Sequence, residues 1–364
     1  MQAVFKMFEN TYEIYFQSVP SFLILILITI AAIILPFYLQ IIIHEAGHLV
    51  FGKLTGYRFL SFRIWNKVLV RENRHWKIKT YSDRDSIGQC LMLPPRKDNR
   101  ETPYALNHLG GIILNGITGI LFLSVSCMEI AFSYFIRLFS FTSGLFGVIM
   151  FIANGLPIRY FGNNDVTNYL ALRKNKSARY FYFQQLKQLP DLQKGKTYGD
   201  LSLEFNRVIK EKDLDNPILG WQKMLEYYSY LDQGWWKKAR ECLSAFQPIK
   251  SLDRGMQYTI QWEELFLSIV IKDDPKEIEM RYQRIKGFIN RKHGDIDLIR
   301  VHLAYKIYRD SQVLTNDKRI KRQEEYRKEM KRRSRNYLYR GKAEFSMKMM
   351  QLVFDQYFCY TVAG

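Results

Sequence analysis

The sequence contains few cysteines, and no two of them are close together. There are four among 364 residues, with no Cys-x-x-Cys spacing: Cys90, Cys127, Cys242 and Cys359. Disulfide-rich scaffolds and cysteine-ligated zinc ribbons depend on closely spaced cysteines. The scarcity excludes both classes, and we expect free thiols that face no oxidising compartment.

Charged residues are missing from a long segment near the N-terminus. No Asp, Glu, Lys or Arg occurs from Ile14 to Ile43. Its densest part, FLILILITIAAIILPFYLQIII, is about as long as a helix that crosses a hydrocarbon core of about 30 Å. A signal peptide fits poorly, because no basic region precedes the segment and no small-residue cleavage site follows it. The pattern predicts a first membrane-spanning helix, kinked at Pro36.

A second apolar region runs from Leu109 to Leu156 and contains only two charged residues. It is long enough for two spans joined by a short turn. We place these spans near residues 107–127 and 139–156. The sequence therefore predicts three membrane helices.

Basic residues are distributed unevenly around the predicted spans. Residues 1–19 contain one, Lys6, whereas twelve lie between Lys53 and Arg100, and the turn between the second and third spans contains only Arg137. Cytoplasmic loops are enriched in Lys and Arg. We therefore expect a short external tail at 1–19 and a cytoplasmic C-terminal region. The composition favours the cell membrane of a bacterium.

The loop between the first two spans, residues 55–103, is rich in alternating apolar and polar residues. IWNKVLV and HWKIKTY contain β-branched and aromatic side chains and flank the polar stretch RENR. This pattern is typical of strands joined by a hairpin turn. We expect a small sheet at the cytoplasmic membrane surface, either purely structural or with an edge that pairs with an extended peptide.

Histidine is also scarce, with six in the chain, yet two of them fall in the pentad HEAGH at the end of the first apolar run. On a helix, His44 and His48 face the same way and can bind one ion, with Glu45 beside them. Imidazole suits zinc, and Glu45 could accept a proton from a zinc-activated water molecule. Ionisable groups at membrane depth are costly and thus candidates for function. The alternative is that they only mark the helix end at the lipid headgroups.

Two histidines do not complete the three-residue ligand set of a catalytic zinc. The candidate third ligand is Asp165, which follows the third apolar segment in FIANGLPIRYFGNNDVTNYL. Asn154 and Pro157 would bend or end the third helix there. Composition alone favours a simple helix stop and loop. His108 starts the second span near the same side, and we favour a structural role for it.

These motifs together resemble the site-2 protease family of intramembrane zinc metalloproteases. HEAGH is similar to the motif of the family's first core helix. Gly111 and Asn115 in GGIILNG resemble its Gly-Pro-x-x-Asn element, with Ile112 at the proline position. NGLPIRYFGNNDV resembles its Asn-x-x-Pro…Asp-Gly element. The resemblance covers residues 20–170, the predicted intramembrane core.

The third element departs from the family pattern in two ways. Pro157 and Asp165 are eight residues apart, where five is usual, and Val166 stands where Gly is expected. Asn163 and Asn164 cannot supply an anionic oxygen, so Asp165 is the preferred ligand.

The resemblance implies hydrolysis of membrane-embedded or membrane-associated peptides near the cytoplasmic face. The β-rich loop would correspond to the family's membrane-associated β element, which presents substrate as an added strand. The implied roles are ligation of one Zn²⁺ by His44, His48 and Asp165, general base catalysis by Glu45, and substrate binding by Asn154 and Asn115.

Residues 171–364 have few Gly or Pro and several helical patterns, which predict an all-α cytoplasmic domain. MLEYYSYLDQGWWKKARECLSAF resembles a tetratricopeptide-type hairpin, and LFLSIVIKDDPKEIEMRYQRIKGFI could be a second. Such a domain could bind a protein or peptide partner. The basic run at 317–342 has twelve Lys or Arg and four Asp or Glu. We interpret this run first as a solvated helix face, and second as a segment that contacts anionic lipid headgroups. We expect no nucleic-acid partner, because no nucleic-acid fold is recognised.

The leading hypothesis is an intramembrane zinc metalloendopeptidase with a helical cytoplasmic domain. The alternative is a catalytically decayed membrane scaffold or peptide-binding protein. A third option is a metalloprotease that acts on soluble substrates, which would normally supply a downstream Glu or His ligand.

Overall fold

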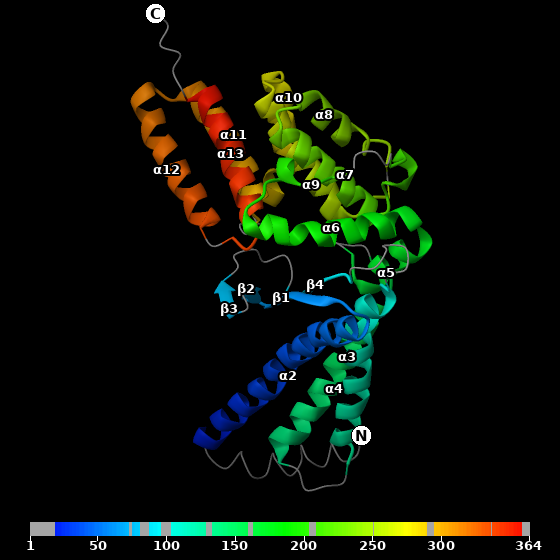
Figure 1. The fold of residues 1–364 in the computed structure, drawn as a ribbon. Helices are drawn as coiled ribbons and strands as arrows, with labels where there is room; N and C mark the ends of the chain where they lie inside the picture. Colours follow the sequence, from blue (N-terminus) through cyan, green and yellow to red (C-terminus); the bar gives the residue numbers. More distant parts are fainter. Residues whose placement is uncertain are drawn as a thin grey trace, which may run out of the picture.

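The computed structural model describes most of the chain: residues 19–72, 75–80, 87–95, 103–128, 133–158, 163–203, 209–249, 251–289, 295–335 and 337–358. Nearly all of the predicted external tail and Cys359 lie outside these ranges. The described chain is mostly helical with one small sheet, as predicted. Figure 1 shows three apolar helices at one end, a larger helical region at the other and the sheet between them.

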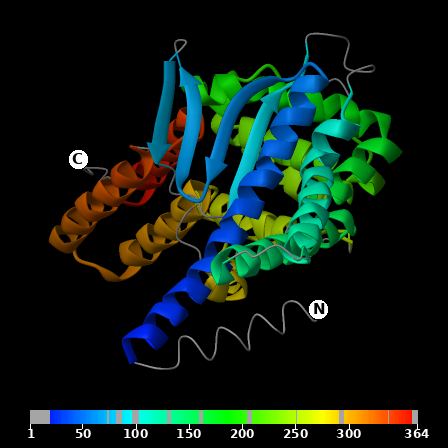
Figure 2. The same cartoon turned by 90° about the horizontal axis from the view of Figure 1, so that it is seen from below.

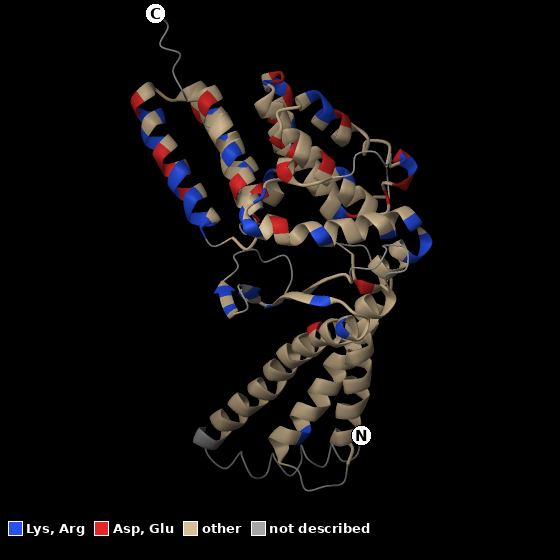
Figure 3. Ribbon diagram, in the orientation of Figure 1, with Lys and Arg blue, Asp and Glu red and all other residues tan. Residues whose placement is uncertain are grey.

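The three apolar helices are α2 (Val19–Leu54), α3 (Ala105–Ser126) and α4 (Tyr134–Gly155). Each is long and apolar enough to cross a membrane. This confirms the prediction of three long apolar helices, by length and composition. Figure 3 shows that they carry few charges, whereas Lys, Arg, Asp and Glu gather on the sheet and the helical region. Helix α2 continues through Pro36 without a break. Helix α4 begins earlier than predicted, because Ser133 accepts a hydrogen bond from the N–H of Ile136 and caps it.

Glycines let the three helices approach to backbone contact. A Cβ atom added to Gly47 would lie 2.3 Å from the carbonyl oxygen of Gly110, and one added to Gly110 would lie 2.6 Å from that of Gly47. Between α3 and α4, a Cβ on Gly147 would lie 2.7 Å from the Cα of Gly119. Helices that associate in lipid use small residues in this way. The crossing of α2 and α3 therefore lies directly at the HEAGH pentad.

We expect Gly110→Ala to destabilise the helix bundle by about 1–3 kcal/mol, the usual cost of overpacking. The added methyl group would meet the backbone of Gly47, which cannot move aside as a side chain could. The midpoint of thermal unfolding in a mild detergent measures the effect. Gly155→Ala is the control, because its Cβ would lie 3.9 Å from Ile112, an ordinary contact. Equal midpoints for both variants would contradict the prediction.

The sheet contains β1 (Arg58–Ile64), β2 (Lys67–Glu72), β3 (His75–Thr80) and β4 (Gly88–Leu93). All pairs are antiparallel, in the order β3-β2-β1-β4. This confirms the predicted small sheet in the loop, and the pairing of Glu72 with His75 places the predicted hairpin between β2 and β3. Figure 2 shows β4, an edge strand, running alongside α2. Buried Val68 and Val70 of β2 join the core of the helical region.

The helical region is all-α in its described residues, apart from two short 3-10 helices. Its helices are α5 (Asp165–Lys174), α6 (Lys176–Lys194), α7 (Pro217–Asp232), α8 (Trp236–Ser244), α9 (Arg254–Val270), α10 (Pro275–Ile289), α11 (Ile296–Val313), α12 (Asn316–Ser334) and α13 (Arg340–Tyr357). The two predicted hairpins coincide with α7–α8 and α9–α10, and their tetratricopeptide type stays a prediction. The predicted domain boundary after residue 170 falls inside α5.

An ion pair lies at the centre of the helical region. The guanidinium of Arg300 on α11 is 2.6 Å from a carboxylate oxygen of Glu263 on α9, and both side chains are 0 % exposed. The hydroxyls of Tyr227 and Tyr228 donate hydrogen bonds to the same carboxylate, at 2.9 and 3.1 Å. Arg300 also stacks on Phe266, 4.0 Å from the ring centre. A buried charge is tolerated only with such partners.

Candidate metal centre

The structure brings the three predicted ligand residues, His44, His48 and Asp165, together at the end of α2. The Nε2 atoms of His44 and His48 are 3.3 Å apart. An Oδ2 oxygen of Asp165, in the first turn of α5, is 2.8 Å from His44 Nε2 and 3.4 Å from His48 Nε2. Within the described part of the chain, these residues form a group that could hold a metal ion.

The spacing of the three donor atoms suits a small divalent cation. The Nε2 atoms of His44 and His48 and the Oδ2 atom of Asp165 lie 2.8–3.4 Å apart, close enough for all three to bind one such ion. Two imidazoles and one carboxylate are a common ligand set for catalytic zinc, which would keep a further position for a water molecule.

Each histidine is oriented by its second ring nitrogen. His48 Nδ1 lies 2.7 Å from the backbone carbonyl of Asn107, and His44 Nδ1 lies 2.6 Å from Asn115 Oδ1. Both partners are acceptors, so each Nδ1 carries a hydrogen, and each Nε2 is the ring atom placed to bind a metal ion beside Asp165. Gly111 leaves room for this arrangement, because a Cβ there would lie 2.7 Å from the His44 ring.

Asn164, which sequence reasoning considered only as an unsuitable ligand, fixes the position of Asp165. Its Oδ1 caps α5 by accepting a hydrogen bond from the N–H of Thr167 at 3.1 Å. Its Nδ2 donates to the backbone carbonyls of Ala153, at 2.8 Å, and of Leu156 at the end of α4. The start of α5 is thereby fastened to the end of α4. Asp165 therefore reaches the two histidines despite the longer Pro157–Asp165 spacing.

The ionisation of Asp165 agrees with a role as ligand. Burial raises the pKa of its carboxyl, but without a metal ion the Nε2 atoms of His44 and His48 can carry hydrogens and donate to it, and the pKa ends well below its usual range. The nearby Cys90 differs, because burial and the Glu45 carboxylate raise the pKa of its thiol to about 12. Cys90 therefore stays protonated near neutral pH without a metal ion, and it is not one of the three residues whose donor atoms converge.

Glu45 lies beside the ligand group, against strand β4. Its side chain is buried, and its carboxylate accepts a hydrogen bond from the backbone N–H of Cys90. A Cβ atom on Gly88 would lie 2.6 Å from Glu45 Oε1, so a side chain there would displace the Glu45 carboxylate. In the described chain β4 pairs with β1 alone, and the edge that meets Glu45 is the opposite one.

The two predicted substrate-binding residues lie in different surroundings. Asn115 is fully buried, with its amide bonded to His44 and Gln40. Asn154 is half-buried near the end of α4, where its Nδ2 donates to the carbonyl of Met150 at 3.2 Å. Contact of either residue with a substrate stays a prediction.

Helix α6 covers the site on the side away from the apolar helices. His108, for which we favoured a structural role, is buried against Tyr182 of α6, with ring centres 5.1 Å apart. Around it, Tyr57, Met92 and Phe183 form a small core that joins α2, the sheet and α6. Helix α6 is therefore packed against the side of the site that His108 forms.

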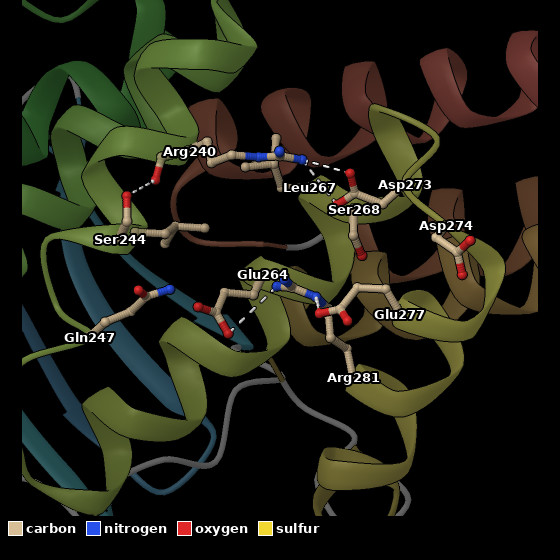
Figure 4. Close-up of a pocket in the computed structure, with 11 residues that line it drawn as sticks. Arg240, Ser244, Gln247, Glu264, Leu267, Ser268, Asp273, Asp274, Glu277 and Arg281 are labelled. Carbon is tan, nitrogen blue, oxygen red and sulfur yellow. Dashed lines mark hydrogen bonds and ion pairs between the residues drawn. The ribbon is translucent and has the colours of Figure 1, made fainter.

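A separate polar pocket of about 500 Å³ lies in the helical region, between α8, α9 and α10 (Figure 4). Arg240 on its upper wall donates from Nη2 to both carboxylate oxygens of Asp273, at 2.7 and 3.0 Å. Arg281 on the lower wall pairs with Glu277 at 2.8 Å. These charges largely satisfy one another, so the pocket does not identify a ligand.

No protein-family model, curated protein or solved structure matches this chain. The functional assignment therefore depends on the geometry of the site.

Proposed function

We propose that this protein is an intramembrane zinc metalloprotease that hydrolyses membrane-embedded or membrane-associated peptides. The observation that carries the proposal is the convergence of His44, His48 and Asp165 on one point, with Glu45 adjacent, at the end of a long apolar helix.

The chain supplies the groups that peptide hydrolysis requires. A zinc ion bound by these ligands would lower the pKa of a water molecule and polarise the substrate carbonyl. The Glu45 carboxylate would accept a proton from that water and return it to the leaving amine. The hydrogen bond from the N–H of Cys90 holds this carboxylate at the side of the site. Asn107 and Asn115 hold the two imidazoles in the tautomer that ligation needs.

The edge of β4 supports an extended substrate. An edge strand offers backbone N–H and C=O groups that can pair with a further strand. Because the edge opposite β1 borders Glu45, a peptide added there would pass the candidate base. Asn154, close to the end of α4, could bind the peptide backbone nearby.

The position of the site along α2 supports cleavage near a membrane surface. The apolar stretch Phe22–Leu54 is 33 residues long, or about 50 Å of helix, against a hydrocarbon core of about 30 Å. His44 is about 33 Å from Phe22 along the axis. The proposed arrangement has an external N-terminus and a cytoplasmic helical domain in a bacterial cell membrane. That domain could bind a protein partner, and the basic segment 317–342 could meet anionic headgroups.

Zinc analysis tests the metal centre directly. We expect one zinc per chain in the full-length protein purified in mild detergent, and its loss in His44→Ala and Asp165→Ala, because two ligands cannot retain it. His75→Ala is the matched control, since His75 is exposed on β3 and should leave zinc in place. A chelator should stop cleavage of single-span peptides in vesicles, and added zinc should restore it. A wild-type protein without zinc would contradict the proposal and favour the decayed scaffold or peptide-binding protein.

A further inference from the structure

Gln40 lies one helical turn before His44 and was not singled out by the motifs. Its side chain is 0 % exposed, inside an apolar helix. An unpaired amide in such a place costs several kcal/mol, so its partners are informative. Nε2 of Gln40 donates to the backbone carbonyl of Ser143 on α4, at 2.9 Å. Its Oε1 accepts from Asn115 Nδ2 on α3, at 2.8 Å.

This chain of hydrogen bonds has only one consistent direction. The Ser143 carbonyl can only accept, so the amide nitrogen of Gln40 must face it and the amide oxygen must face Asn115. Asn115 then has to present its nitrogen to Gln40, whose backbone carbonyl also accepts from it at 3.0 Å. The remaining Asn115 oxygen faces His44 Nδ1. His44 must therefore carry a hydrogen on Nδ1, which leaves Nε2, on the side of Asp165, as the atom that can bind the metal.

The close packing of α4 makes this geometry possible. A Cβ atom on Gly147 would lie 3.1 Å from Gln40 Nε2 and 3.0 Å from the carbonyl of Asn115. With glycine at that position, α4 comes near enough for the Ser143 carbonyl to reach the Gln40 amide. The chain of contacts thus connects all three apolar helices to one ligand.

We propose that Gln40 is a positioning residue for the metal centre. Acting through Asn115, it fixes the tautomer and ring orientation of His44. This inference rests on the proposed function, because it assigns Gln40 to the metal ligand of that site. Groups that orient a metal-bound histidine typically change metal affinity 10–100-fold when they are removed.

The test measures zinc affinity by chelator competition in the full-length protein. We expect Asn115→Leu to weaken zinc binding about 10–100-fold and Gln40→Met about tenfold. The double variant should bind zinc as Asn115→Leu does, because Gln40 acts only through Asn115. Thr142→Val is the matched control: it removes a buried bond from α4 to the carbonyl of Ala32 on α2, remote from His44. It should lower the unfolding temperature without changing zinc affinity.

Two results would overturn the inference: a loss in Gln40→Met no larger than in Thr142→Val, or losses that multiply in the double variant. If Gln40→Met does not fold, Gln40→Asn replaces it, since its shorter side chain cannot reach Ser143 and Asn115 together. Hydrogen exchange of the His44 Nδ1–H, followed by nitrogen NMR of ¹⁵N-histidine-labelled, metal-free protein, gives a second measurement. This hydrogen should exchange slowly in the wild type, where Asn115 holds it, and faster in Gln40→Met. An unchanged exchange rate contradicts the inference even if the wild type binds no zinc, an outcome that would contradict the proposed function separately.

Discussion

Replacement of Glu45 by glutamine is expected to lower the rate of peptide cleavage by about 10²–10⁴-fold, the range typical for a general base, and to leave zinc in place. Glutamine has nearly the same shape and can still accept the hydrogen bond from the N–H of Cys90. It cannot accept a proton from water at neutral pH. Glu45 is also not one of the three converging ligands, so zinc content should be unchanged. Initial cleavage rates of a single-span peptide in vesicles, with zinc measured on the same samples, provide the test.

Glu241→Gln is the matched control, because Glu241 is exposed on α8 and touches no part of the site. It should cleave at the wild-type rate. Cleavage by Glu45→Gln at that same rate would rule out Glu45 as the base. Loss of zinc from Glu45→Gln would instead show that Glu45 supports the ligands rather than the reaction.

Removal of the Arg300 charge is expected to destabilise the helical region by about 3–5 kcal/mol, the usual cost of breaking a buried ion pair. In Arg300→Met the Glu263 carboxylate stays at the centre of the fold without its cation. The two tyrosine hydroxyls that donate to Glu263 cannot replace that charge. Denaturant unfolding of the full chain, monitored by limited proteolysis of the helical region, would measure the loss of unfolding free energy.

Two further variants separate the charge from the packing. Arg240→Met removes a surface ion pair with Asp273 (Figure 4), in which the Arg240 side chain is 55 % exposed. This variant should lose less than about 1 kcal/mol of unfolding free energy. The double variant Glu263→Gln with Arg300→Met should be more stable than Arg300→Met alone, because the Glu263 charge is removed together with its cation. A double variant less stable than Arg300→Met would contradict this account, because the Glu263 carboxylate would then stabilise the fold even without Arg300.

The features that local sequence determines are predictable, and so is the approach of Asp165 to the two histidines, whereas most other tertiary contacts are not. The apolar runs located α2, α3 and α4, because length and composition decide whether a helix can span a membrane. The i, i+4 spacing placed His44 and His48 on one helix face. The return of the third helix to the same end placed Asp165 near them. No sequence signal showed that Asn164 would fasten α5 to α4, since its partners, Ala153 and Leu156, are backbone carbonyls.

Three other features needed the fold itself. The strand order β3-β2-β1-β4 puts the last strand at the edge beside Glu45, and non-local pairing of this kind has no signature in the loop sequence. Glu263 and Arg300 lie on different helices and pair only in the folded chain. In the sequence, each of these two residues looks like an ordinary charged residue of its own segment. Gln40 did carry a signal, because an amide within an apolar run requires a partner. That signal did not show which helix would provide it.

The position of Asp165 in α5 makes any metal bound there a thermodynamic link between two parts of the chain. Two ligands come from α2, and the third comes from the first turn of the helix that begins the helical region. Whatever pulls α5 away from α2 must also release one ligand. At a free metal concentration 100 times the dissociation constant, binding would oppose that separation by about 2.7 kcal/mol. The affinity for the metal would therefore report how firmly the helical region is held against the apolar helices.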